Sequence, residues 1–385
     1  MKPFLLVAGD FIKTGGMDRA NYALADYLVR QGAEVHLVSR RVEPELQQSA
    51  IWHRVPKVAN SNFLSDFLLD RVGQYWARQI SQRGGRVFVN GGNCNWADVN
   101  WVHYVHAAYQ PESKISLLQR AKVAVTHSHF RRTEQRNLRR AKLVIANSER
   151  TKADLVECNL AAQSKIRSIY YGIDPETFYP ATIEEVRSLR QRLNLPLDCS
   201  IAVFIGALSD RRKGFDVLFE AWRHLCQDPA WNVQLFVIGQ GAEVPIWKQR
   251  LSETGLVDRI QFLGFRSDVP DLLRASDCLI APTRYEAYGL GVHEALCCGI
   301  PAIVTETAGV AERYPAALSR LLLSDGSDVF ELVKAMYHWR SHQQHYQFLV
   351  QSQVAPVLRS RSWDQMAQQI VDTIGTVTEV KPVLI

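Results

Sequence analysis

The stretch that decides the fold is Tyr285–Pro301, which reads YEAYGLGVHEALCCGIP. It follows a short apolar run at 277–281 that has the length and composition of a buried strand. Glycines then punctuate a loop, and 294–298 is expected to form about one helical turn, which Gly299 can end in a left-handed cap. A second apolar run, 302–305, predicts another strand. The order strand, loop, helix, strand is typical of an α/β sheet.

Two carboxylates lie on this unit, Glu286 in the loop and Glu294 eight positions later. We expect Glu286 just past the carboxyl end of a strand and Glu294 at the opening of the next helix. Open α/β sheets bind their ligands at that edge. The plain alternative is that Glu294 is only an acid favoured by the helix dipole and that Glu286 is a solvated loop residue. The two glutamates alone leave both interpretations open.

Length and composition limit the possible fold and function classes. A chain of 385 residues predicts about two to three domains, and 47% hydrophobic with 22% charged residues describes an ordinary globular protein with a sizeable core. No apolar run approaches the roughly 18 residues of a membrane span, and the N-terminus does not resemble a signal peptide. Seven cysteines without recurrent spacing predict a reduced, cytoplasmic protein without a zinc site. The net charge of +6 mildly favours an anionic ligand or surface and does not imply nucleic acid.

The N-terminal region opens as a βαβ unit. An apolar strand is expected at 4–8, helical periodicity begins at Ala20, and a second strand is expected at 33–38. Gly15 and Gly16, at the start of the helix, would let an anion approach the backbone amides. A plain turn is the alternative. The loop lacks the Gly-x-Gly-x-x-Gly fingerprint, which argues against a dehydrogenase.

Two histidines and a basic helix follow. His103 and His106 end a strand-like run, where each could face a ligand or be a partly buried side chain bonded to backbone. The segment 129–140 is expected to be a helix with arginines on one face, at positions 132, 136, 139 and 140. That face could contact anionic lipid head groups through salt-sensitive electrostatics, or simply be solvated.

A basic cluster opens the second half of the chain. An apolar strand at 200–206 leads to Arg211, Arg212, Lys213 and Gly214, and a helix is expected directly after them. Backbone amides, the helix dipole and fixed cations converge in such a loop, which predicts a phosphate site. A solvated basic turn is the alternative.

Taken together, these motifs resemble the retaining glycosyltransferases of family 4. The family signature Glu-x7-Glu is present as Glu286 and Glu294, with its usual tail Glu-Ala-x-x-x-Gly-x-Pro at 294–301. Gly172–Asp174, with Phe178–Pro180 downstream, resembles the family's interdomain linker. The resemblance covers nearly the whole chain in matching order.

The resemblance implies an α/β fold of two Rossmann-like domains that face each other across a cleft, the GT-B arrangement, with a C-terminal helix that returns to the N-terminal domain. It places an acceptor-side domain at 1–172, joined by the returning segment 360–385, and a nucleotide-sugar-binding domain at 173–359.

The resemblance also implies the chemistry. A hexose-type sugar would pass from a UDP- or GDP-linked donor to a hydroxyl of a glycan, lipid-linked or small-molecule acceptor, with retained anomeric configuration. Neither a cofactor nor a metal ion is expected, since no Asp-x-Asp motif stands out. The expected catalytic residues are His106, Lys213 and Glu286. The expected donor-binding residues are Gly15, Gly16, Arg212, Lys213, Arg266, Glu286, Tyr288, Gly289, Leu290 and Glu294, with Phe265 and Glu312 as further candidates.

One departure from the family pattern bears on the phosphate site. Lys213 and Gly214 match the family's Lys-Gly, but Ala207 stands where an arginine is usual. Either Arg211 or Arg212 must supply that charge, and we expect Arg212 to do so.

Three other functions stay open. An epimerase of GT-B fold would share the nucleotide-sugar site. A non-catalytic nucleotide-binding protein is compatible with the missing arginine at Ala207. A glycosidase would also use two carboxylates but would leave the basic loop unexplained.

Overall fold

The computed structural model describes residues 2–58, 62–111, 117–209 and 211–378, and the end of the expected returning segment, 379–385, lies outside them. The chain divides into two compact units. Among the described residues, unit 1 comprises 2–58, 62–110, 117–172 and 362–378, and unit 2 comprises 111, 173–209 and 211–361.

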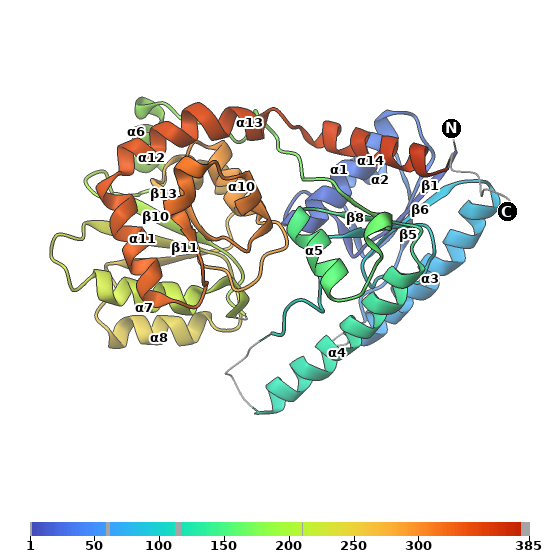
Figure 1. Ribbon diagram of the computed structural model, residues 1–385, viewed down its shortest axis with the longest axis horizontal. Coiled ribbons are helices and arrows are strands. Elements are labelled where there is room, and N and C mark those ends of the chain that lie inside the picture. Colours follow the sequence, from blue (N-terminus) through green and yellow to red (C-terminus); the bar gives the residue numbers. More distant parts are fainter. Residues whose placement is uncertain (1, 59–61, 112–116, 210, 379–385) are drawn as a thin grey trace. The chain divides into compact units, whose positions relative to one another are not determined.

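Unit 1 is built on a parallel sheet. Within the described residues it has seven strands in the order β5-β3-β1-β6-β7-β8-β9. In that order they are Ile51–Arg54, Val35–Ser39, Phe4–Val7, Arg86–Asn90, Val99–Val102, Leu143–Ala146 and Ile166–Ser168. The central strands are apolar along almost their whole length because helices cover both faces of the sheet (Figure 1).

The helices of unit 1 include the segment that returns from the C-terminal part of the chain. They are α1 Gly16–Arg30, α2 Pro44–Gln47, α3 Asn62–Gln82, α4 Leu117–Arg140, α5 Glu149–Glu157 and α14 Trp363–Thr378. On α14, Gln368 accepts a hydrogen bond from the Tyr27 hydroxyl and Asp364 pairs with Arg30, so the helix is fastened along α1. Gly172 lies where this returning chain passes, since an added Cβ would overlap the backbone of Ser362.

The two long helices of unit 1, α3 and α4, lie side by side (Figure 1). The basic segment predicted at 129–140 is the second half of α4, which begins at Leu117, so the prediction was too short. From the sequence we assigned no element to its first half, 117–128. Cys94 packs against Gly73 of α3, where an added Cβ would lie 2.9 Å from the sulfur.

Unit 2 repeats the architecture. Its described part forms a six-stranded parallel sheet in the order β12-β11-β10-β13-β14-β15. In that order the strands are Ile260–Gly264, Val233–Ile238, Ser200–Ile205, Cys278–Ala281, Ala302–Thr305 and Leu322–Leu323. The strands predicted at 277–281 and 302–305 are therefore confirmed as β13 and β14, and the α/β class is confirmed with them.

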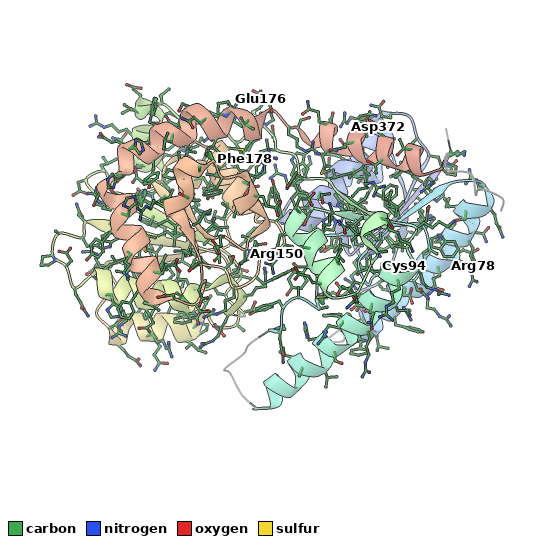
Figure 2. The ribbon with its side chains drawn as sticks, in the orientation of Figure 1. Arg78, Cys94, Arg150, Glu176, Phe178 and Asp372 are labelled. Atoms are coloured by element: carbon green, nitrogen blue, oxygen red, sulfur yellow. The ribbon has the colours of Figure 1, made fainter. Side chains whose placement is uncertain are left out.

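The helices of unit 2 cover both faces of that sheet (Figure 1). They are α6 Ile183–Arg192, α7 Phe215–Leu225, α8 Val244–Glu253, α9 Val269–Arg274, α10 Leu290–Cys297, α11 Val329–Ser341, α12 Gln343–Leu349 and α13 Ala355–Arg359. Trp222 and Trp339 are fully buried in the core. Phe178, also buried, receives a hydrogen bond at its carbonyl oxygen from Arg359 Nε at 3.0 Å, which ties the linker to α13 (Figure 2).

Candidate functional site

The site in unit 2 lies where the strand order reverses. From β10 the chain proceeds outward to β11 and β12, then returns to the other side of β10 with β13. Parallel pairing of Ala202 with Cys278 and of Val203 with Leu279 brings the carboxyl ends of β10 and β13 together. The loops that follow these two strands carry the basic cluster and Glu286, so the topology alone makes them neighbours.

The basic cluster forms a tight turn against the second loop. Arg211–Lys213 makes one turn of 3-10 helix, and Gly214 with φ of 73° caps α7. Only glycine fits there, because an added Cβ would overlap the carbonyl oxygen of Pro282. The backbone N–H of Arg284 donates to the carbonyl oxygen of Arg212 at 2.8 Å, so the turn and the loop are joined through backbone.

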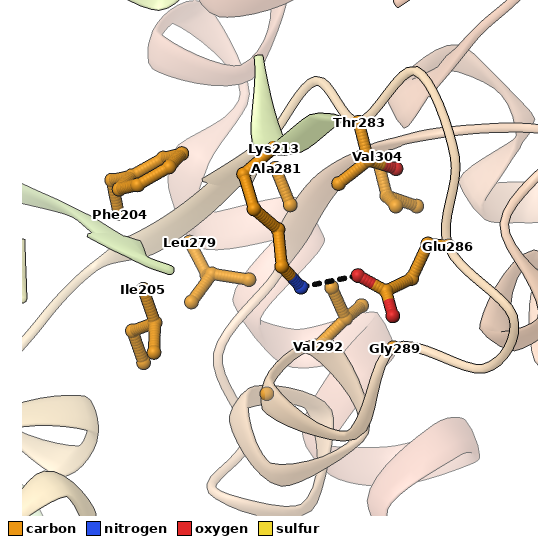
Figure 3. Close-up of a pocket in the computed structure, with 11 residues that line it drawn as sticks. Phe204, Ile205, Lys213, Leu279, Ala281, Thr283, Glu286, Gly289, Val292 and Val304 are labelled. Carbon is orange, nitrogen blue, oxygen red and sulfur yellow. Dashed lines mark hydrogen bonds and ion pairs between the residues drawn. The ribbon is translucent and has the colours of Figure 1, made fainter. Parts of the chain in front are cut away.

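Glu286 faces two of the cations. Lys213 Nζ donates a hydrogen bond to Glu286 Oε2 (Figure 3). Arg212 Nη1 lies 3.6 Å from the same oxygen. Arg212 also donates to the carbonyl oxygen of Tyr285 at 3.2 Å. The side chain of Glu286 is only 14% exposed. A cavity of about 30 Å³, large enough to hold a water molecule, lies beside the pair among apolar side chains that include Leu279.

The charge state of Glu286 follows from this geometry. Burial acts to raise the pKa of its carboxyl group, but the positive charges of Lys213 and Arg212 outweigh burial and hold the pKa below its usual value. The site therefore presents an ionised carboxylate with two fixed cations around it.

The third basic residue, Arg211, pairs with Asp216. Arg211 Nη1 lies 3.2 Å from Asp216 Oδ2, and Arg284 donates to both oxygens of the same carboxylate, at 2.8 and 2.9 Å. Arg284 also donates to the carbonyl oxygen of Arg211 at 2.5 Å. These contacts hold the Arg211–Lys213 turn in place. Arg212, which we expected to replace the missing charge at Ala207, is thus placed at Glu286.

The second glutamate is placed differently from the sequence prediction. The helix α10 begins at Leu290 after Gly289, whose φ of 103° forms the N-cap. Glu294 therefore lies in the second turn and does not open the helix, which corrects the prediction. The left-handed glycine at 289 starts the helix a turn earlier than the apolar pattern indicated. Glu294 is 9% exposed, and Gly299 with φ of 75° ends the helix as predicted.

The remaining residues predicted in unit 2 vary in placement. Tyr288 is buried, and its hydroxyl lies 2.5 Å from His293 Nδ1. Arg266 pairs with both oxygens of Asp268, and Phe265 is exposed. Glu312 is exposed as well.

In unit 1, Gly15 with φ of 81° forms the N-cap of α1, and Gly16 is its first residue. This helix N-terminus is not a simple cationic site, because Asp18 lies in its first turn. Burial, together with the nearby charge of Asp10, raises the pKa of Asp18 to about 6. The glycine loop therefore combines helix amides with a carboxyl group that titrates near neutral pH.

The two predicted histidines have separate roles. His103 is buried, with Nε2 3.1 Å from Asn90 Nδ2 and Nδ1 2.5 Å from the Tyr171 hydroxyl. Since Asn90 must donate, Nδ1 carries the proton, and burial lowers the pKa of His103 to about 3. His103 is thus a hydrogen-bonded core residue. His106 is half-buried, and burial together with His127 lowers its pKa to about 4, so its ring is neutral at pH 7.

One residue near His106 escaped the sequence analysis. The carboxylate of Glu134 is fully buried in α4 and accepts hydrogen bonds from the backbone N–H groups of His106 and Ala107, at 3.0 and 3.3 Å. Burial raises its pKa to about 7, although these hydrogen bonds oppose the rise. Glu134 is the one acid in the basic run 129–140. That isolation was the signal that could have identified it.

Among the described residues, no group of three or more His, Cys, Asp or Glu side chains is arranged to hold a metal ion. None of the helices in the described part of the chain is both long and apolar enough to cross a membrane.

Family comparisons agree with this site. The sequence model of a family described as glycosyl transferases group 1 matches 199–342, which carries the basic turn and both glutamates. A second, described as glycosyltransferase family 4, matches 14–177. The chain belongs to the group 1, family 4 glycosyltransferases. Both of its Rossmann-like units are therefore accounted for by one family of transferases.

Individual relatives are distant. The chain is 27% identical over 255 residues to a D-inositol 3-phosphate glycosyltransferase of Salinispora tropica, covering 63% of this chain and 52% of that protein. It is 24% identical over 398 residues to the mannosylfructose-phosphate synthase of Agrobacterium fabrum, covering 93% and 86%. The match spans about half the length of the first of these glycosyltransferases.

Solved structures share the fold. The Anabaena protein HepE in complex with UDP and glucose superimposes with a TM-score of 0.70 at 21% identity, covering 98% of this chain and all of that one. Sucrose-phosphate synthase from Thermosynechococcus elongatus gives 0.79 at 20% identity, covering 99% of this chain and all of that one. Both units thus belong to the GT-B fold of glycosyltransferases.

Proposed function

We propose that this glycosyltransferase moves a hexose-type sugar from a UDP- or GDP-linked donor to a hydroxyl group of a glycan or small molecule, with retained anomeric configuration and without a metal ion or cofactor. The observation that carries the proposal is the cluster of Lys213, Arg212 and Glu286, at the place in unit 2 where the strand order reverses. Two fixed cations beside a helix-capping turn suit a departing diphosphate. The named relative HepE was solved with UDP and glucose, which supports a nucleotide-sugar donor.

Each residue has a chemical role in this proposal. Lys213 and Arg212 stabilise the negative charge that develops on the leaving phosphate, and Glu286 accepts hydrogen bonds from hydroxyls of the donor sugar. Glu294 does the same for the ribose. His106, neutral at pH 7, accepts or donates a hydrogen bond at a sugar hydroxyl. The transition state resembles an oxocarbenium ion, and stabilising the departing charge is the main catalytic effect.

The acceptor side is proposed more broadly. The curated relatives include a D-inositol 3-phosphate glycosyltransferase and a 2-deoxystreptamine glucosyltransferase, whose names describe small hydroxylated acceptors. A lipid-linked acceptor and a peripheral contact with anionic membrane belong to the same proposal. The exposed arginines of α4, at 132, 136, 139 and 140, would make that contact.

A thermal-shift screen with UDP-, GDP- and ADP-sugars tests donor binding. A ligand at 100 times its dissociation constant stabilises the protein by about 2.7 kcal/mol. For a unit of this size that raises the melting temperature by about 5–11 °C. The control is Lys213→Met, whose own melting temperature is measured first and whose shift with nucleotide sugar should be much smaller. Equal shifts in the two proteins would contradict the assignment of the diphosphate site.

Product analysis then separates the functions. With the donor identified, transfer to an acceptor should appear with an anomeric proton of the donor's configuration in the NMR spectrum. Lys213→Met should lower turnover about 100- to 1,000-fold, the cost of removing one preorganised charge. Conversion of the donor sugar without any acceptor would instead indicate an epimerase. Binding without either product would indicate a nucleotide-binding protein.

A further inference from the structure

A second cavity of unit 2 lies beside the basic turn, the segment Arg211–Lys213. Its volume is about 280 Å³, close to the lower end of the range of about 300–1,000 Å³ that is usual for small-molecule sites. It shares no lining residue with the small cavity at Glu286. Its lining residues come from the basic turn, from α7, α8 and α11 and from the loops after β13 and β15: Arg211, Asp216, Val217, Glu220, Arg250, Arg284, Ser327 and Val329.

Three helices frame this cavity. α7 contacts α8 and α11, because the rings of Phe219 and Trp247 have centroids 5.3 Å apart and those of His224 and Phe330 lie 5.2 Å apart. The three helices are neighbours in Figure 1. The lining residues of α7 belong to its first two turns, so the cavity lies at the end of α7 that follows the basic turn.

Two arginines of the lining share a single carboxylate. Arg211 and Arg284 both pair with Asp216, which is 13% exposed, so these three side chains carry one net positive charge. Arg211 Nε is also buried and has no hydrogen-bond partner in the part of the chain that the structure describes. The hydrogen-bonding capacity of its guanidinium group is therefore not used up by Asp216.

The other charged residues of the lining increase the excess of positive charge. The guanidinium group of Arg250 lies 5.1 Å from the centre of the Trp247 ring, and no carboxylate of the described residues pairs with it. Glu220 is negative, but it pairs at 2.6 Å with Arg223, which lies outside the lining. The charge of Arg250 is thus added to the net charge of the first group, and the cavity favours an anion.

The remaining lining residues fit an anion that is small and has a carbon part. Guanidinium groups present several N–H donors in one plane and bind phosphate oxygens through charge-assisted hydrogen bonds. The hydroxyl group of Ser327 accepts a hydrogen bond from Arg284 Nε at 3.1 Å, so its own proton is available for a ligand oxygen. Val217 and Val329 give the wall an apolar part.

We infer that this cavity binds a phosphate dianion, either as a small phosphate monoester or as free phosphate. The phosphate group contacts Arg211, Arg250 and Arg284, and the carbon part of an ester lies against Val217 and Val329. This ligand is a molecule other than the nucleotide sugar, and its binding does not depend on sugar transfer.

A bound phosphate dianion restrains the basic turn. Arg284 donates to the carbonyl oxygen of Arg211 through its side chain and to that of Arg212 through its backbone N–H. An anion that holds the guanidinium groups of Arg211 and Arg284 together therefore restrains both loops. Local opening, which exposes their backbone amides to exchange with solvent, becomes rarer.

Calorimetric titration of the full chain in phosphate-free buffer tests binding. The probes are inorganic phosphate and glycerol 3-phosphate, at constant ionic strength. Arg250→Met should weaken binding about 10- to 100-fold, because it removes one charge-assisted hydrogen bond. The matched control is Lys248→Met, which removes an exposed positive charge from the same helix outside the lining and should change the affinity little.

Two further variants locate the site. Ser327→Asp places a carboxylate beside Arg284 and should abolish binding of both probes. Because Ser327 is exposed, this variant should keep the melting temperature of the wild type. Arg212→Met changes the cation beside Glu286 and should bind both probes as tightly as the wild type.

Hydrogen exchange measured by mass spectrometry gives a structural readout. The backbone N–H groups of Gly214 and Arg284 donate to the carbonyl oxygens of Arg211 and Arg212. Peptides that contain these two amides should exchange more slowly in the presence of glycerol 3-phosphate. In Arg250→Met the same probe concentration should give much less protection.

The two probes distinguish the sources of the phosphate group. Binding of glycerol 3-phosphate that is tighter by about tenfold or more indicates a monoester, and equal affinities indicate free phosphate. The inference is overturned if neither probe binds the wild type, or if Arg250→Met and Lys248→Met weaken binding equally. It is also overturned if Arg212→Met abolishes binding, which would place the anion at Glu286. Failure of the proposed function looks different, because nucleotide sugars would then give no thermal shift while phosphate still binds.

Discussion

Replacing Lys213 with Met tests how the diphosphate site is built. Glu286 is 14% exposed and keeps its charge because Lys213 and Arg212 face it. Without the lysine, Arg212 at 3.6 Å is the remaining cation that we described beside Glu286. The effect of burial on the pKa of Glu286 then exceeds the effect of that one charge. The variant should therefore lose stability in unit 2 and should show a raised pKa for the Glu286 carboxyl group.

The size of the effect follows from burial. Removing one partner of a buried ion pair typically costs about 3–5 kcal/mol. Here Arg212 stays and Glu286 keeps some contact with water, so we expect about 2–3 kcal/mol. A domain of this size loses about 2–4 °C of melting temperature per kcal/mol, which gives a fall of about 4–12 °C. Glu286→Gln in the Lys213→Met background should recover most of this loss, because it removes the unpaired charge.

The pH dependence has a definite sign. In the wild type, the depressed pKa of Glu286 stabilises the folded protein at neutral pH, and this contribution is lost as pH falls through that pKa. In Lys213→Met the raised pKa makes the ionised carboxylate destabilising at neutral pH, and protonation relieves the penalty as pH falls. The difference in melting temperature between the two proteins should therefore narrow from about pH 7.5 to about pH 5.

Differential scanning calorimetry of the wild type, both single variants and the double variant measures these quantities. Single effects that add to within about 0.5 kcal/mol would show that the two side chains are not coupled and would refute the reasoning. So would a melting-temperature difference that stays constant across the pH range. Arg211→Met is a suitable control, because Arg211 pairs with Asp216 and its loss should leave the pKa of Glu286 unchanged.

Three further predictions concern other parts of the chain. Gly214→Ala should abolish the nucleotide-induced thermal shift, because φ of 73° and the carbonyl oxygen of Pro282 leave no room for a Cβ; a shift of normal size would contradict this close approach. Burial raises the pKa of Glu134 to about 7, so the stability that its protonated form contributes is lost as pH rises through 7. In Glu134→Gln the free energy of unfolding measured by calorimetry should therefore fall less between pH 5 and 8, by up to about 3 kcal/mol. An unchanged pH profile of that free energy would argue against this account. The protein should sediment with anionic vesicles at low salt and less so after Arg132→Gln and Arg139→Gln, and equal recovery with neutral vesicles would exclude the lipid contact.

Much of the sheet framework could be predicted from the sequence. Buried parallel strands are continuous apolar runs, and β13 and β14 were therefore visible as 277–281 and 302–305. The Gly299 cap was also predictable, since a glycine and a proline after an apolar turn carry a local conformational reason. Local patterns of this kind depend on neighbours in the sequence alone.

Features that depend on distant contacts were less accessible. The start of α10 was misplaced because Gly289 caps the helix with a left-handed φ, beside Val310, where an added Cβ would lie 2.9 Å from Cγ1; no local pattern reveals this close approach. Glu134 was missed because its partners lie on the β7 loop, far away in the sequence. A cavity of about 420 Å³ between α3 and α4 was also not predictable, because the residues that these helices contribute to its lining lie some 60 positions apart in the sequence.

The central claim is that Arg212 and Lys213, placed at Glu286, bind the diphosphate of a nucleotide sugar. Calorimetric titration of UDP and GDP into the wild type, Arg212→Met and Arg211→Met tests it most directly. A charge-assisted hydrogen bond contributes about 1.5–3 kcal/mol, so Arg212→Met should weaken binding about 10- to 100-fold while Arg211→Met changes it little. Equal losses in both variants, or a larger loss with Arg211→Met, would contradict the account.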